Sequence, residues 1–484
     1  MNQLTKTALC LAVVTTLSGC MVGPTYEKPA LIFANNFIHS AELDLENARS
    51  KKTLADMRQW WRGFNDALLD QFIEQALNQN LTLKQAIARV NQADAQVASL
   101  YSQLLPSGQL NAQATKAHIS VEDLMGRILN STPGFNRNVE LYDLNASVNW
   151  EIDIFGGTRR GVEAAMAEYQ ASQAAAIATQ LKITSEVANT YVSIRTLQAR
   201  IAIAKERAAT QGKLVDLVKL QLSRGIAPEF QLRQAEGSLA EVQSTIPALE
   251  NGLEIAMHAF DVLMGDQPGT HRAKLEKLQA IPVAPGIDTA SGPAELLRRR
   301  PDIIVAERKL EASNALIGHA ISEYYPKISI SGLIGTITTK YGVLFSSDAN
   351  RAAGVVGLRW RLFDFGRVEA EVAAAEGVNE EALAAYRLTV LKAAEEVENA
   401  FSTVVKKSDE QRILATGEAS LAKSRDAALA GYKSGALSLL EVLDIDERLL
   451  RMQDAMVRAQ SDSVRAVIQS FNALGGGWDA QSFS

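Results

Sequence analysis

One short stretch contains residue types that could take part in phosphoryl transfer. Asp364-Phe365-Gly366, within RWRLFDFGR, carries the letters with which protein kinases hold magnesium. The sequence has neither a Gly-rich loop followed by V-A-I-K nor an H-R-D motif, so the kinase context is absent. An alternating, aromatic-tipped run precedes the stretch and a long helical pattern follows it. We therefore predict a strand-to-helix junction, with Asp364 as a capping or interfacial polar residue and Gly366 as a permissive backbone position.

A second candidate is the carboxylate pair Glu441 and Asp444. The two residues are three apart and follow Gly435, so a helix would place them on one face. Several copies gathered around an axis would form a carboxylate ring that concentrates cations. Alternatively the face is solvated and Asp444 pairs with Arg448 four residues on. The residues by themselves favour this second interpretation.

The remaining polar residues do not suggest an enzyme. The sequence has no G-x-x-x-x-G-K-[ST], G-x-S-x-G or H-E-x-x-H motif. The formal net charge is −6 and the one basic run is Arg298-Arg299-Arg300, so we predict no nucleic-acid partner. We also predict no metal site and no catalytic residue, because the five histidines lack metal-ligand spacing; they are His39, His118, His258, His271 and His319.

The N-terminus has the features of an export signal. A positive residue, Lys6, is followed by an apolar run from Ala8 to Leu17 that is too short to span a bilayer. Leu17-Ser18-Gly19-Cys20 then has the form of a bacterial lipobox, whose cysteine sulfur takes a lipid. We predict a signal peptide over 1–19 and a lipid on Cys20, with no other cofactor. The alternative is an ordinary signal peptide with an incidental cysteine.

The rest of the chain repeats itself. An offset of 210 residues aligns Trp150 with Trp360, Gly156 with Gly366, and Gly225 with Gly435, among other matches. One register held over more than a hundred residues is a specific signal of duplication. Upstream the offset is 220, so ten extra residues lie between Pro106 and Trp150, where ILNSTPGFNRN forms a polar, turn-rich insert.

The repeat defines the predicted domains. Each half contains an amphipathic helix (67–104 and 294–323), two strands, a very long helix, a glycine turn and a return helix. The predicted parts are a lipidated extended segment, a first repeat, a Pro/Gly-punctuated linker, a second repeat and a tail, over 20–66, 67–267, 268–293, 294–477 and 478–484.

The strands are visible in the alternation of side chains. Apolar residues alternate with polar ones at Leu144, Ala146, Val148 and Trp150. The same alternation recurs at Val356, Leu358, Trp360 and Leu362. This alternation is typical of outer-membrane strands, and also of an amphipathic hairpin in a soluble sheet. No run of 18 apolar residues follows the signal peptide, so we expect no transmembrane helix and favour membrane strands.

The long helices require partners. Residues 162–224 contain no proline and one glycine, and would span about 95 Å as a helix; 367–434 would span about 100 Å. Such lengths need packing along the whole helix, as in a coiled coil or a cylinder of helices. Four strands cannot close a membrane sheet, so several chains must pool them. Two chains would supply eight strands, and three would supply twelve, the first count to leave a lumen. We therefore predict a mixed membrane α+β fold, a trimeric twelve-stranded β-barrel continued by a periplasmic helical barrel.

These features resemble the TolC family of outer-membrane efflux channels, in particular its OprM-like lipoprotein branch (NodT-type). The resemblance covers essentially the whole mature chain, and its motifs are individually weak but occur together and in order. They are Cys20 with Gly23-Pro24-Thr25-Tyr26-Glu27-Lys28-Pro29, Trp60-Trp61 and the segment from Phe64 to Leu77, Arg300-Pro301-Asp302, Tyr325-Pro326, Phe363-Asp364-Phe365-Gly366, and Leu474-Gly475-Gly476-Gly477-Trp478.

The resemblance implies a non-enzymatic trimer in the outer membrane. It would be a passive exit duct for small molecules in a tripartite pump, with a periplasmic adaptor docked at the tips Gly225 and Gly435 and an inner-membrane pump of the RND type. Alternatives are a type I protein-secretion duct and a lipid-anchored coiled-coil scaffold.

The resemblance also implies a gate at the tip of the second hairpin. Glu441 and Asp444 match the acidic pair that narrows the periplasmic entrance of TolC, with Tyr432 and Leu437 as the steric part. One departure is that OprM carries its gate aspartate where this chain has Leu437.

Overall fold

The computed structural model describes residues 21–30, 36–289 and 293–479. The predicted signal peptide and Cys20 therefore lie outside the described residues. The described chain packs into two compact units, which we treat separately. The first comprises the described residues of Met1–Lys28 with Val90–Ala171 and Ala306–Ala385, and the second comprises those of Pro29–Arg89, Ser172–Val305 and Tyr386–Ser484.

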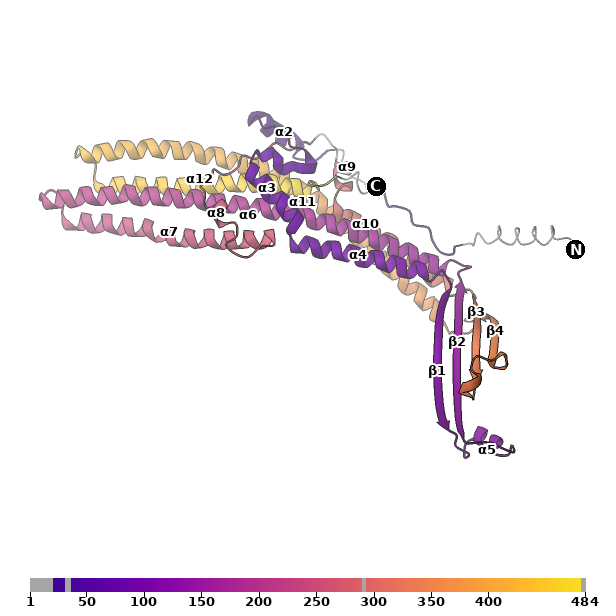
Figure 1. Ribbon diagram of the computed structural model, residues 1–484. Coiled ribbons are helices and arrows are strands. Elements are labelled where there is room, and N and C mark those ends of the chain that lie inside the picture. The colour runs from indigo at the N-terminus through magenta and orange to yellow at the C-terminus, as the bar shows by residue number, and fades with distance from the viewer. Residues whose placement is uncertain (1–20, 31–35, 290–292, 480–484) are drawn as a thin grey trace. The chain divides into compact units, whose positions relative to one another are not determined.

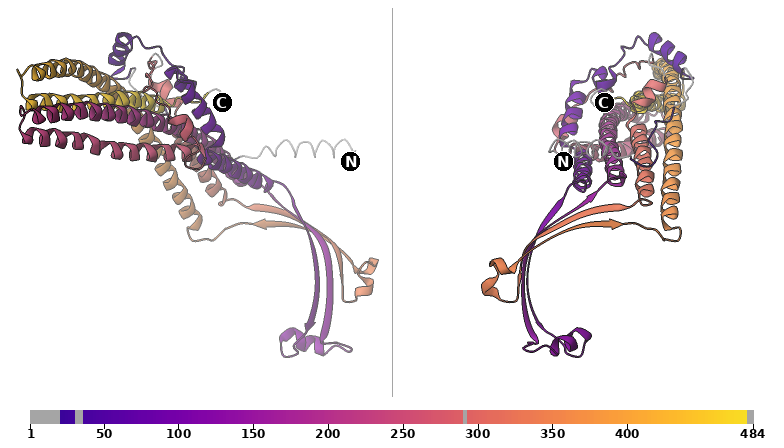
Figure 2. Two further views of the ribbon diagram at one scale, coloured as in Figure 1. Left: turned by 60° about the vertical axis from the view of Figure 1, so that its left-hand side comes forward. Right: turned by 90° about the vertical axis from the view of Figure 1, so that its right-hand side faces the viewer.

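The first unit contains a four-stranded antiparallel sheet in the order β1-β2-β3-β4 (Figure 1). The strands are β1 (Ser107–His118), β2 (Asn138–Ile152), β3 (Lys327–Thr338) and β4 (Asn350–Arg359). Sequential neighbours pair, so each hairpin of the duplicated sequence lies beside the other. Figure 2 shows that the four strands curve together along their length.

The two faces of the sheet differ as the alternation predicts. Large apolar side chains such as Leu110, Ile334 and Val356 are exposed on one face. On the other face Asn111, Asn145, Gly335 and Arg351 stand directly opposite one another across the four strands. A β-carbon at Gly335 would collide with Asn145 in that row. The two strand hairpins are thus built into one sheet with an apolar and a polar side.

An ion pair crosses the polar face over this glycine. Nη2 of Arg351 on β4 lies 2.6 Å from both carboxylate oxygens of Asp143 on β2, and Asp143 also accepts a hydrogen bond from Asn145 at 2.8 Å. Asn111 of β1 donates to Asn145 at 3.3 Å. A chain of polar contacts therefore joins β1, β2 and β4 across β3.

The connections within the hairpins are short helices. The helix α5 (Leu124–Asn130) extends into the first three residues of the turn-rich insert, so the prediction of turns is correct from Ser131 onward. Asp123 starts this helix because its side chain accepts a hydrogen bond from the Gly126 amide. Two 3₁₀ turns, η2 (Tyr341–Val343) and η3 (Ser347–Ala349), join β3 to β4.

The second unit is built on two long helical hairpins (Figure 1). α6 (Gly157–Ser223) returns through α7 (Glu229–Met264), and α11 (Arg367–Lys433) returns through α12 (Leu439–Ala473). The two long helices contribute residues to both units. Their extents agree with the predicted helical runs within a few residues. Among the described residues no helix is long and apolar enough to cross a membrane.

The predicted helices 67–104 and 294–323 are each two helices. The first is α3 (Ala67–Gln79) and α4 (Leu81–Ser102), separated by Asn80, whose extended backbone lets its side chain bond the Leu83 amide and the Leu263 carbonyl. The second is α9 (Pro293–Arg298) and α10 (Pro301–Ser322). Proline disfavours the helical conformation at the residue before it, so Pro301 starts a new helix.

Aromatic residues fix the N-terminal part of the second unit. Trp60, in η1 (Met57–Phe64), is fully buried and stacks on Phe471 of α12 with ring centroids 5.4 Å apart. The amide of Gly477 donates to the Met57 carbonyl at 2.7 Å. The other short helices are α2 (Ser40–Arg49) and α8 (Arg272–Leu275). The segment of η1 and the C-terminal end of α12 with the residues after it thus pack together in the second unit.

Candidate functional site

The DFG stretch is a helix cap. The carboxylate of Asp364 accepts hydrogen bonds from the amides of Gly366 at 3.3 Å and Val368 at 2.9 Å, and α11 begins at Arg367. Gly366 has φ +85° and Phe365 has φ +54°, so the chain turns through left-handed backbone between strand and helix. The predicted capping role of Asp364 is confirmed.

The long helix of the first repeat is also capped by an aspartate, but one at a different position in the repeat. Asp153 caps α6 through the amides of Thr158 and Arg159 at 3.1 and 2.8 Å. In the 210-residue register Asp153 corresponds to Phe363 rather than to Asp364. A carboxylate at the entry of each long helix is therefore retained although its position in the sequence is not.

The two hairpin tips contain the same backbone turn. Gly225 and Gly435 have φ +69° and +80°, values that favour glycine. In the first tip the amide of Ile226 donates to the Gln221 carbonyl at 2.9 Å, and in the second the amide of Ala436 donates to the Gly431 carbonyl at 2.8 Å. Both predicted tip glycines thus reverse the chain by one mechanism.

The tips present apolar side chains to their surroundings. Ile226 and Phe230 at the first tip are each about two-thirds exposed, and so is Leu440 at the second. Leu437 is half-buried because it packs over Gly431, which has no side chain in the way. Exposed apolar groups of this size at the end of a hairpin are suited to contact with another protein.

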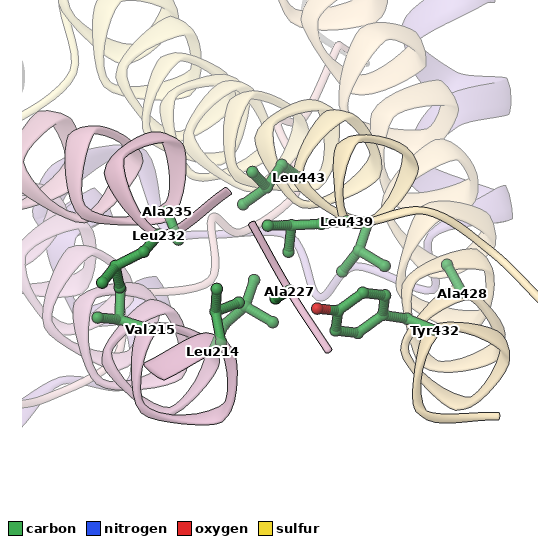
Figure 3. Close-up of a cluster of buried hydrophobic side chains, with 11 residues drawn as sticks. Leu214, Val215, Ala227, Leu232, Ala235, Ala428, Tyr432, Leu439 and Leu443 are labelled. Atoms are coloured by element: carbon green, nitrogen blue, oxygen red, sulfur yellow. The ribbon is translucent and has the colours of Figure 1, made fainter. Parts of the chain in front are cut away.

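Tyr432 joins the two hairpins below their tips. Its ring points from α11 into a cluster of buried apolar side chains on all four hairpin helices (Figure 3). Its hydroxyl donates to the side-chain oxygen of Gln221 on α6 at 2.6 Å, and burial raises the pKa of that hydroxyl. Tyr432 is therefore held between the hairpins.

Glu441 acts as a helix cap. Its carboxylate accepts hydrogen bonds from the Ser438 amide and hydroxyl, both at 2.7 Å, while the Ser438 hydroxyl accepts from the Glu441 amide. This reciprocal arrangement is a capping box at the start of α12. The hydrogen bonds from Ser438 lower the pKa of Glu441.

Asp444 makes the pairing that the sequence offers as its alternative. Its carboxylate lies 2.9 Å from Nε of Arg448, one helical turn on. Both side chains are about half exposed. Within this chain Glu441 thus has a partner in the N-cap residue of α12, and Asp444 has one on the helix itself.

A further carboxylate, Asp446, was missed by sequence reasoning. It is buried on α12 and lies 3.1 Å from Nη1 of Arg207 on α6, while the same guanidinium donates to Gln453. Burial raises the pKa of Asp446 and lowers that of Arg207. The signal was present, because Leu439, Leu443, Asp446 and Leu449 follow the apolar spacing of α12.

The site therefore has two layers. The tip glycines and exposed apolar residues form an outer surface, and two contacts behind it, Tyr432 with Gln221 and Arg207 with Asp446, hold the second hairpin to the first. In the described part of the chain no group of three or more His, Cys, Asp or Glu residues is arranged to hold a metal ion. The two helical hairpins are thus tied, meaning that these two side-chain contacts hold them together.

Comparison with known proteins gives a consistent result. The family model "Outer membrane efflux protein" matches residues 72–266 and 292–476. Nodulation protein T of Rhizobium leguminosarum bv. viciae is 30% identical over 96% of this chain and 92% of its own. The pyoverdine export outer membrane protein OpmQ of Pseudomonas putida is 31% identical over 90% and 91%. The structure of the outer-membrane channel OprN superposes with a TM-score of 0.84 at 29% identity, covering 95% of this chain and all of the other.

Proposed function

This chain belongs to the family of outer membrane efflux proteins, and on that premise we propose that it is the small-molecule exit duct of a tripartite pump. It is a channel rather than an enzyme, located in the outer membrane and extending into the periplasm. Small molecules are favoured over secreted proteins because OpmQ, a relative that aligns along most of the chain, is named for export of pyoverdine. The pathway is an inner-membrane pump of the RND type joined to this duct by an adaptor.

The observation that carries the proposed pathway is the pair of apolar tips. Ile226 and Phe230 on one hairpin and Leu440 on the other are exposed around Gly225 and Gly435. An adaptor that ends in its own apolar surface would cover them. Two equivalent turns in one chain offer the adaptor two similar contact points, which three chains would multiply to six.

Assembly as a trimer follows from the edges of the sheet. β1 and β4 each have one paired neighbour in the chain, so each leaves an edge of backbone amides and carbonyls. Unpaired edges are costly in a membrane. In the trimer β1 of one copy pairs with β4 of the next, and the three sheets together supply twelve strands.

The gate comprises Tyr432, Leu437, Glu441 and Asp444. Tyr432 is tied to Gln221 and Leu437 is packed over Gly431 in this structure, and we propose that this arrangement is the closed state. Three copies of Glu441 and Asp444 would set six carboxylates around the axis, which concentrates cations at the entrance. Opening requires the second hairpin to separate from the first at Tyr432.

The anchor is the lipid on Cys20. Lipid chains and sheet would hold the protein in the membrane independently. Replacing Cys20 by serine behind a cleavable signal should abolish labelling with palmitate, yet the protein should still fractionate with the outer membrane. Its release as soluble periplasmic protein would contradict the membrane role of the sheet.

The pathway is tested by complementation. In a strain that lacks this channel but retains its adaptor and pump, the wild-type protein should restore resistance to small toxic compounds. Phe230→Asp with Leu440→Asp should abolish that resistance while the trimer still reaches the outer membrane. Leu278→Asp, in the linker between the repeats, changes an equally exposed leucine and should complement normally. Restoration of protein secretion with no change in resistance would overturn the proposed cargo.

A further inference from the structure

A small cavity behind the second tip has an unusual wall. It has a volume of about 310 Å³ and lies between α6, α11 and α12 in the second unit. This is the lower end of the range for small-molecule sites. Its lining residues are Thr210, Lys213, Leu214, Leu217, Arg425, Leu429, Lys433, Val442 and Asp446.

The wall carries an excess of positive charge. Lys213, Arg425 and Lys433 line it, against one acidic residue. That acidic residue, Asp446, is already paired with Arg207 at 3.1 Å. Within the described residues Lys213 and Lys433 form no ion pair. These two lysines, which are exposed, therefore have no carboxylate partner among the described residues.

Arg425 forms an ion pair but makes no well-aligned hydrogen bond through its Nε. Its Nε is buried and makes no hydrogen bond to any described residue, although it lies 3.1 Å from the exposed carboxylate of the adjacent residue, Asp426. A buried guanidinium N–H without a well-aligned acceptor is costly because its hydration is lost, and among the four such arginines of the described chain Arg425 lines this cavity. An anion in the cavity would supply that acceptor.

A second cavity on the same hairpins differs in how its cations are paired. The second cavity, of about 520 Å³, is also apolar and also lined by arginines, namely Arg200, Arg451 and Arg458. There Arg200 and Arg458 both pair with Asp454, and Arg451 pairs with Glu447. In the second cavity all three arginines thus have an ion-pair partner, whereas in the first Arg425 has one and Lys213 and Lys433 have none among the described residues.

We propose that the smaller cavity binds a small amphiphilic anion, an aromatic sulfonate or carboxylate with an apolar body. The anionic group would lie among Arg425, Lys433 and Lys213, where charge-assisted hydrogen bonds are strongest. The apolar body would lie against Leu214, Leu429 and Val442. The ligand contacts α6 together with α11 and α12, so it adds to the contacts that hold the hairpins together.

This contact has a consequence for transport, which rests on the gate proposed above. A ligand that binds the tied hairpins more tightly than the separated ones shifts the equilibrium toward the tied state. The anion would therefore lower the fraction of time for which the channel is open. Export of anionic amphiphiles would then slow as they accumulate at the periplasmic entrance.

The binding experiment uses 1-anilinonaphthalene-8-sulfonate with the full-length trimer in lipid nanodiscs. Titration by fluorescence should show one saturable site per chain, and its neutral analogue N-phenyl-1-naphthylamine should not compete. Arg425→Gln with Lys433→Gln should weaken binding about tenfold or more. Lys423→Gln is the matched control, because this lysine is exposed on the same helix and does not line the cavity.

A second variant guards against a loss of fold. Val442→Phe fills the cavity without changing any charge, and should also abolish binding in trimers that keep their helical content. Unchanged binding in the double variant, or equal binding of the neutral analogue, would overturn the proposal. No binding to the wild-type trimer, as expected if a neighbouring subunit fills the cavity, would overturn it as well.

The consequence for the gate is measured separately. In planar bilayers the sulfonate on the periplasmic side should reduce the open probability of wild-type channels severalfold, and of the Lys423→Gln control, but not of the double variant. Binding without any effect on opening would leave the site in place and contradict its link to the gate. If tests of Tyr432 contradict the proposed gate, the binding result still stands, because binding is measured independently of channel opening.

Discussion

The two helical hairpins share one backbone plan and differ in the polar residues that they contribute. Position 236 of the first repeat corresponds to position 446 of the second. Glu236 is partly exposed on α7 and pairs with Arg233 one turn away, whereas Asp446 is buried on α12 and pairs with Arg207 of the other hairpin. Duplication has thus kept the helices and turns and assigned the contact between hairpins to non-equivalent residues.

The strand-to-helix junctions show the same contrast. Gly156 lies under Met21, and the buried guanidinium of Arg160 donates to the carbonyls of Val22 and Gly23. In the second repeat a β-carbon at Gly366 would be in ordinary contact with Glu369, 3.8 Å away, and Phe365 is fully exposed. The segment after Cys20 therefore covers the first junction and leaves the second free. A duplicated fold becomes asymmetric where a single-copy segment packs on one half.

The largest effect is expected when the buried ion pair between Arg207 and Asp446 is broken. Arg207→Ala should reduce the stability of the trimer by about 3 kcal/mol, because it leaves the Asp446 carboxylate buried without its partner. Glu236→Ala, at the equivalent position of Asp446, should change stability by less than about 0.5 kcal/mol, since its ion pairs are on the surface. The measurement is the apparent unfolding temperature by circular dichroism at one protein concentration.

A double variant separates loss of a partner from loss of packing. Arg207→Met with Asp446→Leu should recover much of the stability, because no charge remains buried. Equal effects of Arg207→Ala and Glu236→Ala would show that the hairpins do not depend on this pair.

The next effect compares Gly156→Ala with Gly366→Ala. Both residues have positive φ, so both variants lose about 1 kcal/mol from the backbone. A β-carbon at Gly156 would also lie 2.5 Å from Cγ and 3.0 Å from Cα of Met21, whereas at Gly366 the nearest atom is 3.8 Å away. We expect only Gly156→Ala to release the N-terminal segment, seen as faster proteolysis at Lys28. Equal protection in the two variants would contradict this account.

A smaller effect is expected from the tyrosine contact. Tyr432→Phe removes the hydroxyl that bonds Gln221 and should weaken the hairpin contact by about 1 kcal/mol. Gln221→Ala should do the same, and the two changes together should cost less than their sum. Hydrogen exchange of 425–440 reports the result. Ser434→Ala is the control, because that hydroxyl bonds within its own turn; strict additivity would show that the contact is not made.

The smallest effect is a pH dependence confined to the second tip. The folded-state pKa of Glu441 is lowered, so its capping box contributes stability above the ordinary glutamate pKa of about 4.3 and loses it as pH falls through the lowered value. The amides at the start of α12 should therefore exchange faster, relative to the intrinsic rate, below about pH 4. Pro228, which caps α7, has no such side chain, so the first tip should not respond.

Substitution of Glu441 by glutamine sharpens this test. Glutamine can still reach the Ser438 amide but does not titrate, so Glu441→Gln should keep the cap and lose the pH dependence. An unchanged pH dependence in this variant would assign the titration to another group.

Much of this molecule could be predicted from local patterns. The 210-residue offset, the alternation of Leu144 to Trp150 and the proline-free runs located the second strand of each hairpin, the long helices and both tip turns, whereas β1 and β3 were expected without bounds. Asp364 could be recognised as a cap because capping depends on amides two to four residues away. These features are determined by interactions between neighbours in the sequence.

The helix breaks and the internal contacts were not predictable in the same way. Asn80 interrupts a continuous amphipathic pattern because its side chain finds the carbonyl of Leu263, 183 residues on. Asp446 could be recognised as a polar residue at an apolar position, but the sequence does not name Arg207 as its partner. Both outcomes depend on which helix packs alongside.

The sequence by itself therefore determined the elements and their order, and the tertiary structure decided how the hairpins are tied together. Tyr432 meets Gln221 across 211 residues, and Arg207 meets Asp446 across 239. Such pairs form only in one register of helix packing, which is set by the burial of many apolar side chains at once. The same packing created the cationic cavity, because Lys213 and Lys433 come together only when α6 lies beside α11.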